Sequence, residues 1–309
     1  MTHLTPENTN QMVDKQRKIA TVAPEQAHVR SMRSMIWRQF RRHRVAMVAA
    51  AVLIVLTLAV YLAPIIAPYE FDAIDLKHVK QPPSKEHWLG TDDLGRDLLT
   101  RILYGGRISM SIGIFSALVA TIFGSLVGAF AGFYGGTVDN ILMRFTDIIF
   151  AIPSLPLLIV LTSYTNAAIP VMVLIIGFLS WMGTARVVRG SVLSLKEQEF
   201  VSAARMIGTR DRAVIFRHIV PNAMGPIIVG ATLGVGMAII IESSLSFLGL
   251  GVSPPTPTWG NMLQDSQDTM STKPWLTIFP GLAILVTVLC INFVGDGLHD
   301  ALDPTLHRG

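Results

Sequence analysis

Residues 148–185 read IIFAIPSLPLLIVLTSYTNAAIPVMVLIIGFLSWMGTA and contain no charged side chain. At a rise of about 1.5 Å per residue, one helix of this length would exceed the hydrocarbon core of a bilayer, which roughly 20 apolar residues cross. The polar residues 163–166 and Pro170 interrupt the run near its middle, where a helix is expected to stop. We therefore predict two membrane-spanning helices here rather than one.

Four further uncharged runs are long enough to span a membrane, and they cover residues 45–67, 108–138, 219–241 and 275–294. Cytoplasmic loops of membrane proteins collect Lys and Arg. Residues 30–44 carry six arginines, and residues 186–217 carry seven basic and three acidic side chains. Six spans put both basic segments and both chain ends in the cytoplasm, whereas five spans would leave residues 186–217 outside. We therefore expect an all-α, multi-pass membrane protein with six transmembrane helices.

The composition agrees with a membrane protein, because 51% of the 309 residues are hydrophobic and 15% are charged, against about 25% charged in soluble proteins. The single Cys290 excludes a disulfide framework, and the eight histidines are scattered rather than spaced as metal ligands. The sequence lacks the motifs of a phosphate-binding loop, a zinc protease and a GxSxG hydrolase. We therefore expect no catalytic residue, no metal site and no cofactor in this chain. The net charge of +4 indicates membrane topology rather than nucleic-acid binding.

The spans divide the chain into segments with different roles. We expect a disordered cytoplasmic tail, a basic amphipathic segment on the inner leaflet, a first span, an external loop, a transport core and a second cytoplasmic tail, at residues 1–28, 29–44, 45–67, 68–106, 107–296 and 297–309. The basic segment interleaves arginines with apolar residues, which is typical of a helix held by anionic lipid. The first apolar run is longer than the core of a signal peptide, which has about 7 to 15 residues. We therefore predict that it is a membrane anchor rather than a signal peptide.

The basic loop 186–222 holds the clearest local pattern. Apolar residues trace one helical stripe at positions 200, 203, 204 and 207. Gly208 ends this helix as a left-handed cap would, and Thr209 or Asp211 is expected to cap a second short helix before a break at Pro221. A helix-turn-helix of this kind outside the lipid is suited to docking into a groove of a partner protein. The alternative is a loop that packs only on its own helix bundle.

Four glycines recur every four residues in and after the second span, at positions 124, 128, 132 and 136. Such a face lets two helices approach closely, which favours a packing role over a role in a substrate path. Charges near the membrane need a partner or water. Arg144 and Asp147, three residues apart on one helical face, are expected to pair with each other. Glu242 either faces a solvated pathway or lies in water near the outer interface.

The basic loop resembles the cytoplasmic loop of the permease subunits of bacterial ABC importers. The pattern of that family is E-A-A, three residues, G, nine residues and I-x-L-P. The residues that we assign to it here are Ser202, Ala203, Ala204, Gly208, Ile219 and Pro221. Ser202 replaces the glutamate of the family, His218 replaces its isoleucine and Val220 replaces its leucine.

The external loop resembles the G-T-D-x-x-G-R-D signature of the peptide and nickel branch of the same family. Its signature residues are Gly90, Thr91, Asp92, Asp93, Gly95, Arg96 and Asp97. Further matching stretches at residues 245–251, 254–260 and 295–304 extend the resemblance over nearly all of the chain from residue 30 onward.

The chemistry of the external segments leaves alternatives open. Gly90 and Gly95 permit the sharp turns that would present the charged residues between them. Arg96 either holds a neighbouring aspartate and fixes the shape of the loop, or contacts a docked binding protein. Trp259, which follows a proline-rich stretch, is expected at the level of the lipid headgroups.

The resemblance implies a type I ABC importer permease fold in the bacterial inner membrane, with both termini inside. It implies a second, homologous permease subunit, one or two cytosolic ATPase subunits that grip residues 202–221, and an extracytoplasmic substrate-binding protein. ATP and Mg²⁺ would then bind the ATPase partners and not this chain. Oligopeptides are the expected cargo, with dipeptides, glutathione and nickel as alternatives. The other class of function is a secondary transporter driven by an ion gradient, which would need charged relay residues deep in several helices, where Glu242 is nearly alone.

Overall fold

The computed structural model describes residues 32–165 and 168–302. The chain divides after Arg38 into two compact units. Of the first unit, the described residues belong to α2 (Met32–Arg42), which forms within the predicted basic amphipathic segment. The predicted disordered tail at residues 1–28 lies outside the described residues.

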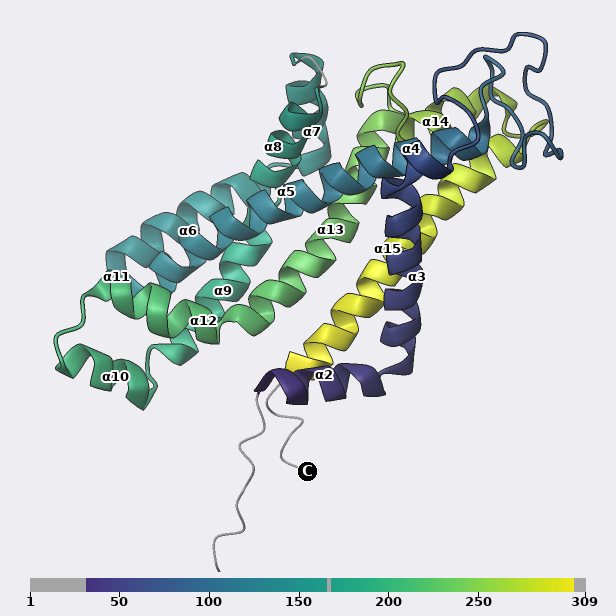
Figure 1. Ribbon diagram of the computed structural model, residues 1–309. Coiled ribbons are helices and arrows are strands. Elements are labelled where there is room, and N and C mark those ends of the chain that lie inside the picture. Colours follow the sequence, from purple (N-terminus) through teal and green to yellow (C-terminus); the bar gives the residue numbers. More distant parts are fainter. Residues whose placement is uncertain (1–31, 166–167, 303–309) are drawn as a thin grey trace, which may run out of the picture. The chain divides into compact units, whose positions relative to one another are not determined.

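The second unit is built from helices that are long and apolar enough to cross a membrane (Figure 1). Four of them are single helices, namely α3 (Arg44–Tyr61), α5 (Leu98–Tyr134), α13 (Met224–Phe247) and α15 (Trp275–Leu302). Two more spans are bent pairs, namely α6 (Gly136–Ala151) with α7 (Ser154–Ser163), bent by 78°, and α8 (Ile169–Phe178) with α9 (Trp181–Leu195), bent by 45°. With each pair counted as one span, the predicted total of six is confirmed. The described ranges contain no strand, only one isolated antiparallel bridge between Thr91 and Asp97.

The predicted division of residues 148–185 is confirmed, because α7 ends at Ser163 and α8 begins at Ile169 with Pro170 in its first turn. The sequence did not reveal the two bends. The first lies at Ile152, which is extended before Pro153, as a residue preceding proline usually is. The second lies at Ser180, whose hydroxyl bonds the Ile176 carbonyl at 2.7 Å and so competes with the helix ladder.

Helix boundaries differ from the predicted ones at several further places. Helix α5 begins at Leu98, inside the predicted external loop 68–106 and ten residues before the predicted span at 108, because Asp97 caps it there. Helix α13 runs from Met224 to Phe247 rather than over 219–241. The span predicted to begin at residue 148 begins at Gly136, because α6 includes the polar turns that precede the apolar run. The last span continues to Leu302, so the predicted cytoplasmic tail from residue 297 begins as helix. Gly297 lies inside α15, where an added Cβ would collide with Ala46 of α3.

Short helices lie in the connections between the membrane-spanning helices. The loop between α9 and α13 contains α10 (Glu199–Met206), α11 (Asp211–Ala213), the π-helix η1 (Val214–Ile219) and α12 (Val220–Asn222), and α13 is followed by α14 (Trp259–Asp265). A 3-10 turn spans Gln267–Thr269, and α4 (Ala63–Ile66) follows α3.

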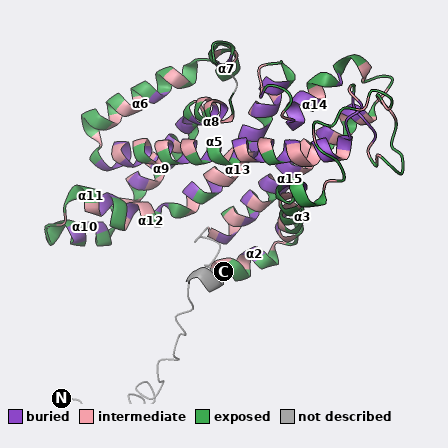
Figure 2. Ribbon diagram, turned by 45° about the horizontal axis from the view of Figure 1, so that its top comes forward, coloured by how far each residue is buried: buried purple, intermediate pink, exposed green. Residues whose placement is uncertain are grey.

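Helix α5 is the central helix of this unit and packs against α8, α9 and α13. Its glycine face lies directly on α9, because a Cβ at Gly124 would come within 2.6 Å of the Trp181 carbonyl oxygen. The next two glycines of the series, at 128 and 132, meet the α9 backbone one and two turns further on, whereas Gly136 faces open space. Close helix packing is therefore what the first three glycines provide. Figure 2 shows the contrast between the buried face of α5 and the largely exposed α6, where Thr146 alone is buried.

Candidate functional site

Helix α10 in the cytoplasmic loop has one buried and one exposed side. Val201 and Ala204 are 0% and 5% exposed and belong to a hydrophobic cluster with residues of α5, α9 and η1. Met206 and Ile207 are each 82% exposed, and Phe200 is 39% exposed. We call residues 200, 203, 206 and 207 the outer face of α10. This loop thus both packs on its own bundle and presents apolar side chains away from it.

Of the stripe predicted at positions 200, 203, 204 and 207, three residues lie on the outer face of α10, and only Ala204 packs inward. Val201, which the stripe omitted, takes the second inward place, since it meets the buried surface of η1. Gly208 has φ +78° and ends the helix in the left-handed conformation that was predicted. The predicted capping side chain is absent, because Arg210 occupies the N-cap of α11 without a side-chain hydrogen bond.

The remaining residues assigned to the loop pattern are divided between surface and core. Ser202, Ala203 and Pro221 are exposed, and Ile219 is fully buried. Pro221 lies in the first turn of α12, and the helical path breaks two residues later at Ala223. The pattern therefore contributes exposed positions on α10 and buried positions on η1.

Charged contacts join this loop and α6 to the bundle. The Arg205 guanidinium of α10 lies 4.8 Å from the Phe133 ring centroid of α5. Arg189 of α9 donates to both carboxylate oxygens of Asp139 at 2.5 and 2.6 Å, and Arg186 donates to Asp147 at 2.7 Å. The predicted pair of Arg144 with Asp147 is therefore wrong, since the arginine of a facing helix takes that carboxylate.

The external loop is a folded structure around Asp92. One oxygen of this carboxylate accepts the N–H groups of Leu94 and Arg96, both at 2.9 Å, and the other accepts Arg96 Nε at 2.7 Å. Arg101 Nε lies 3.2 Å from the same second oxygen. Asp92, Arg96 and Arg101 are 7%, 7% and 3% exposed. Of the two alternatives for Arg96, the geometry is that of the internal one, because its guanidinium is buried on Asp92.

The other signature residues complete this fold. Asp97 caps α5 by accepting the Thr100 N–H at 2.8 Å, and it also holds the His87 ring at 2.9 Å. Gly95 has φ +75°, and a Cβ there would collide with the Asp75 carbonyl oxygen. Gly90 and Thr91 are buried, whereas Asp93 is exposed. We call residues 90–101 the external clamp.

A second contact in the external loop involves a histidine. The His78 ring hydrogen-bonds the Asp75 carboxylate at 2.6 Å, and the Lys77 N–H donates to it at 3.0 Å. These two contacts hold the pKa of Asp75 below its usual value.

Glu242 of α13 is fully buried, so neither predicted alternative for it, a solvated pathway or water at the interface, describes the structure. Its carboxylate accepts the Ser246 hydroxyl at 2.8 Å, which in turn lies 3.4 Å from the Thr258 hydroxyl at the start of α14. Thr258 and Asn261 form a capping box for that helix. Glu242 thus belongs to a polar cluster that connects α13 to α14.

Trp259 is not at the headgroup level as predicted. It is 2% exposed, and its Nε1 donates to the Ile102 carbonyl of α5 at 2.9 Å. Its backbone N–H donates to the Ser109 hydroxyl at 3.2 Å. The chain after the proline-rich stretch therefore re-enters the bundle and fastens α14 to α5.

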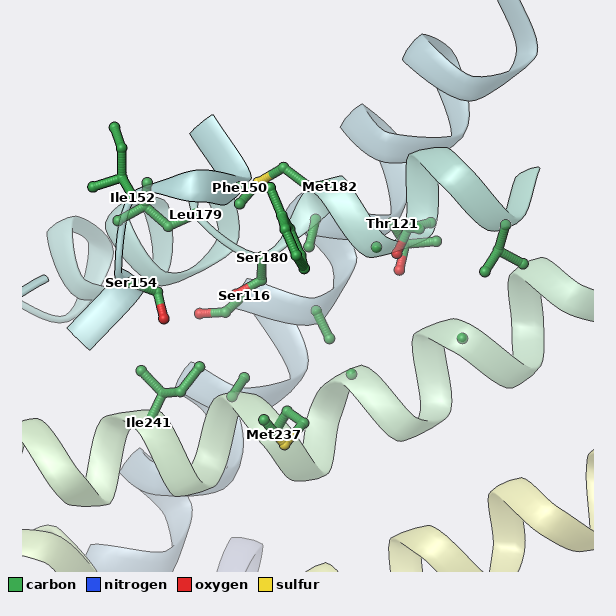
Figure 3. Close-up of a pocket in the computed structure, with 18 of the residues that line it drawn as sticks. Ser116, Thr121, Phe150, Ile152, Ser154, Leu179, Ser180, Met182, Met237 and Ile241 are labelled. Carbon is green, nitrogen blue, oxygen red and sulfur yellow. The ribbon is translucent and has the colours of Figure 1, made fainter. Parts of the chain in front are cut away.

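A cavity of about 520 Å³ opens beside both helix bends. We call it the bend cavity, and its wall consists of α5, the α6–α7 bend, the α8–α9 bend and α13. In Figure 3 the side chains of Ser116, Ser154 and Ser180 point into the space facing Met237 and Ile241 of α13. None of its lining residues, all of which are described, is ionisable. The sequence analysis did not predict this cavity, and the prolines at 153 and 156 are the one local signal compatible with its first bend.

No group of three or more His, Cys, Asp or Glu side chains within residues 32–165 and 168–302 is arranged to hold a metal ion. The histidines and aspartates of the external loop bond one another or arginine instead, as His87 does with Asp97. Cys290 is a free, buried thiol.

Comparison with known proteins relates the chain to transport proteins. Residues 124–308 match the family described as "Binding-protein-dependent transport system inner membrane component", and residues 31–83 match the "N-terminal TM domain of oligopeptide transport permease C". The chain is 42% identical to the oligopeptide transport system permease protein OppC of Bacillus subtilis, over 87% of this chain and 88% of that one.

Two other relatives are named for different cargoes. The glutathione transport system permease protein GsiD of Pectobacterium atrosepticum is 42% identical over 87% of this chain and 90% of its own. The dipeptide transport system permease protein DppC of Alkalihalophilus pseudofirmus is 40% identical over 87% of this chain and 89% of its own. Among solved structures, an inward-facing MetNI methionine ABC transporter matches with a TM-score of 0.53 and 16% identity, covering 65% of this chain and 96% of that one.

Proposed function

We propose that this chain forms, with a second permease subunit, the path by which oligopeptides enter the cell. The chain belongs to the family of binding-protein-dependent transport system inner membrane components. It is a multi-pass permease subunit of an ABC importer. Cytosolic ATPase subunits bind its cytoplasmic loop, and an extracytoplasmic binding protein delivers the cargo. ATP and Mg²⁺ bind the ATPase partners, and this chain contributes no residue to ATP hydrolysis.

The observation that carries the proposal is the two-sided α10. Its inner residues Val201 and Ala204 are buried in the cluster that includes η1 and the end of α5. Its outer face exposes Met206 and Ile207, each by 82%, in a loop outside the predicted membrane spans. Exposed apolar side chains in water favour a protein partner. A force on the outer face is passed to the bundle through the buried side.

The mechanism follows as alternating access. Closure of the ATPase dimer moves α10, and the Phe133 contact of Arg205 together with the buried Val201 couples that movement to α5. The glycines of α5 bring its backbone into close contact with α9, so the two helices move as one body. The cargo path then opens to one side of the membrane at a time.

The external loop offers a surface for the binding protein. Ile74, Leu76 and Trp88 are 61%, 72% and 71% exposed on a loop whose fold is fixed by the external clamp. Large exposed apolar side chains on a rigid support are suited to docking another protein. The internal use of Arg96 leaves these apolar residues as the better contact candidates.

The choice among cargoes favours an organic molecule over nickel. The His and Asp side chains of the external loop, which offered the best ligand set for a metal, are engaged with one another or with arginine. Oligopeptides remain the proposed cargo, with dipeptides and glutathione as alternatives in the same chemical class. The relatives are named for the transport of oligopeptides, glutathione and dipeptides, which covers all three.

The coupling part of the proposal is tested by Ile207→Glu in the complete importer reconstituted in liposomes. Because Ile207 is 82% exposed, the change leaves the bundle intact. It adds a charge to the outer face, and we expect peptide uptake to fall about tenfold or more, with ATPase subunits lost from the purified complex. Gln198→Glu, which adds the same charge at the exposed residue just before α10, is the matched control. Equal uptake by both variants and the unchanged importer would reject the role of α10.

A further inference from the structure

The bend cavity has a chemistry of its own that the assignment as a permease does not specify. Five hydroxyl side chains line it, at Ser116, Thr121, Ser154, Ser180 and Thr184, among aliphatic, Met and Phe side chains. Its volume of about 520 Å³ lies within the range of roughly 300–1,000 Å³ that is typical of ligand pockets. The cavity is therefore large enough for a short peptide segment.

The hydroxyls of the bend cavity retain capacity to hydrogen-bond a ligand. Thr121 is 9% exposed, lines the cavity and makes no hydrogen bond within the described part of the chain. Ser116 and Ser180 donate to the carbonyl oxygens of Val173 at 3.2 Å and of Ile176 at 2.7 Å, which leaves their own oxygens free to accept. The Thr121 hydroxyl opens onto the cavity rather than being enclosed by protein atoms, so a ligand in the cavity can hydrogen-bond it.

The position of the cavity beside two bent helices also points to a ligand. Irregular backbone at membrane depth is tolerated where it lines a water-filled cavity, and transport proteins place their binding sites at discontinuous helices. Here the α6–α7 bend and the α8–α9 bend, separated by the whole α7–α8 hairpin in sequence, contribute to one wall.

The lining restricts what the cavity accepts. A charged group that enters it finds no opposite charge in the lining, and Arg186, which lies 4.3 Å from the ring centroid of the lining Phe150, is already paired with Asp147. Burial without a counter-charge is strongly unfavourable. A divalent transition metal finds no carboxylate, imidazole or thiolate, the ligands that such ions prefer. A peptide main chain is neutral and carries alternating N–H donors and C=O acceptors, which match hydroxyl groups that both donate and accept.

We propose that the bend cavity is a cargo site within the membrane, which binds the main chain of a peptide through hydroxyls including Thr121 and favours uncharged side chains at the segment it holds. The inference rests on the proposed function and deepens it. The site binds the main chain, which all peptides share, so it accepts peptides of many sequences. It discriminates only by charge.

The first experiment measures ATP-driven uptake by the complete importer in liposomes, with three labelled peptides that differ only in a central Ala, Glu or Lys. We expect Thr121→Val, which keeps the shape and removes the hydroxyl, to lower the uptake of all three by about fivefold. Thr287→Val is the matched control, because Thr287 is a buried threonine of α15 with an unpaired hydroxyl outside the cavity lining. Unchanged uptake with Thr121→Val, at normal amounts of importer, would overturn the proposal.

A pair of opposite charges provides a readout that a structural role would not give. Met237 lines the cavity and is 58% exposed, so Met237→Glu and Met237→Lys leave the packing within this chain intact. We expect the Glu variant to shift the ratio of Lys-peptide to Glu-peptide uptake upward by at least about tenfold, and the Lys variant to shift it downward by as much. A ratio that is the same in both variants would contradict the proposal.

A binding measurement separates this proposal from the proposed function. In the complete importer with Cys290→Ala, the Ala-centred peptide is expected to slow maleimide labelling of Ser154→Cys about fivefold and to leave labelling of Ser84→Cys on the external loop unchanged. Labelling of both cysteines at the same rate with and without peptide would reject the site. Protection of Ser154→Cys without any ATP-driven uptake would instead support the site and reject the proposed function.

Discussion

Asp92 holds the external clamp together, and removing its charge should loosen that loop. Its carboxylate accepts three hydrogen bonds at 2.7–2.9 Å and lies 3.2 Å from Arg101 Nε. Both arginines are buried, so Asp92→Asn removes the carboxylate that they share and leaves Arg96 only the exposed Asp93, 3.6 Å away. Breaking a buried pair in this way costs about 3–5 kcal/mol. The amide also turns one acceptor into a donor that faces Arg96.

The neighbouring Asp93 provides a matched control. Its side chain is 41% exposed and lies 3.6 Å from Arg96 Nη2, the geometry of a surface pair. Such a pair contributes about 0–1 kcal/mol, so Asp93→Asn should change little. The two variants remove the same charge from adjacent positions, and the account requires them to differ by at least about 2 kcal/mol.

Hydrogen exchange of the purified importer measures this difference locally. A loss of about 3 kcal/mol corresponds to roughly a hundredfold faster exchange of the protected amides at Leu94 and Arg96 when the loop opens. In the double variant Asp92→Asn with Arg101→Leu, part of the protection of these amides should return, because one of the two buried guanidinium charges is gone. Equal exchange in Asp92→Asn and Asp93→Asn would refute the reasoning.

Three further predictions concern other contacts. Gly128→Ala places a Cβ against the Ala185 carbonyl oxygen and should lower the stability of the importer by about 1–3 kcal/mol in thermal unfolding. Gly190→Ala, with open space around it, should be neutral. Equal unfolding temperatures for the two variants would contradict the packing of α5 on α9. Glu242→Ala leaves the buried Ser246 hydroxyl without its acceptor and should cost about 1–3 kcal/mol of stability, and Glu242→Gln should cost less. The reverse order would contradict the polar cluster that connects α13 to α14. Trp88→Ala should raise the concentration of binding protein needed for half-maximal uptake at least about threefold without changing the maximal rate, and an unchanged half-maximal concentration would move the docking surface elsewhere.

The sequence predicted the features that depend on neighbouring residues. The end of α7 near Ser163 and the left-handed Gly208 follow from local polarity and backbone preference, and both are found. The glycine series predicted a close helix contact, although its partner α9 could not be identified from the repeat alone. Six spans followed from the length of the apolar runs and the distribution of arginines.

The features that the sequence failed to predict depend on tertiary contacts. Asp147 has Arg144 within reach on its own helix, but Arg186 of α9 offers a closer partner once the helices pack. The sequence predicted an apolar stripe on α10 but not the side that packs on the bundle; Val201 packs inward and Ile207 faces outward because η1 sets the surface that α10 meets. Trp259 follows a loop that returns to α5, and no local pattern indicates that return.

The bend cavity illustrates the same limit at the level of a site. Its wall combines residues from Ser116 to Ile241 on four separate stretches of chain. Pro153 is compatible with the start of a helix as well as with a bend, and only the packed structure shows that the second bend, at Ser180, meets the first. A search of the sequence for motifs does not reveal such a site.

The central claim is that this chain is a permease subunit of an ATP-driven peptide importer, and uptake of a labelled oligopeptide tests it most directly. The measurement uses liposomes that contain this chain, the second permease, the ATPase subunits and the binding protein, with ion gradients collapsed and each component omitted in turn. The account predicts uptake that requires ATP and every component. Peptide uptake by this chain alone, driven by an ion gradient and indifferent to ATP, would contradict it.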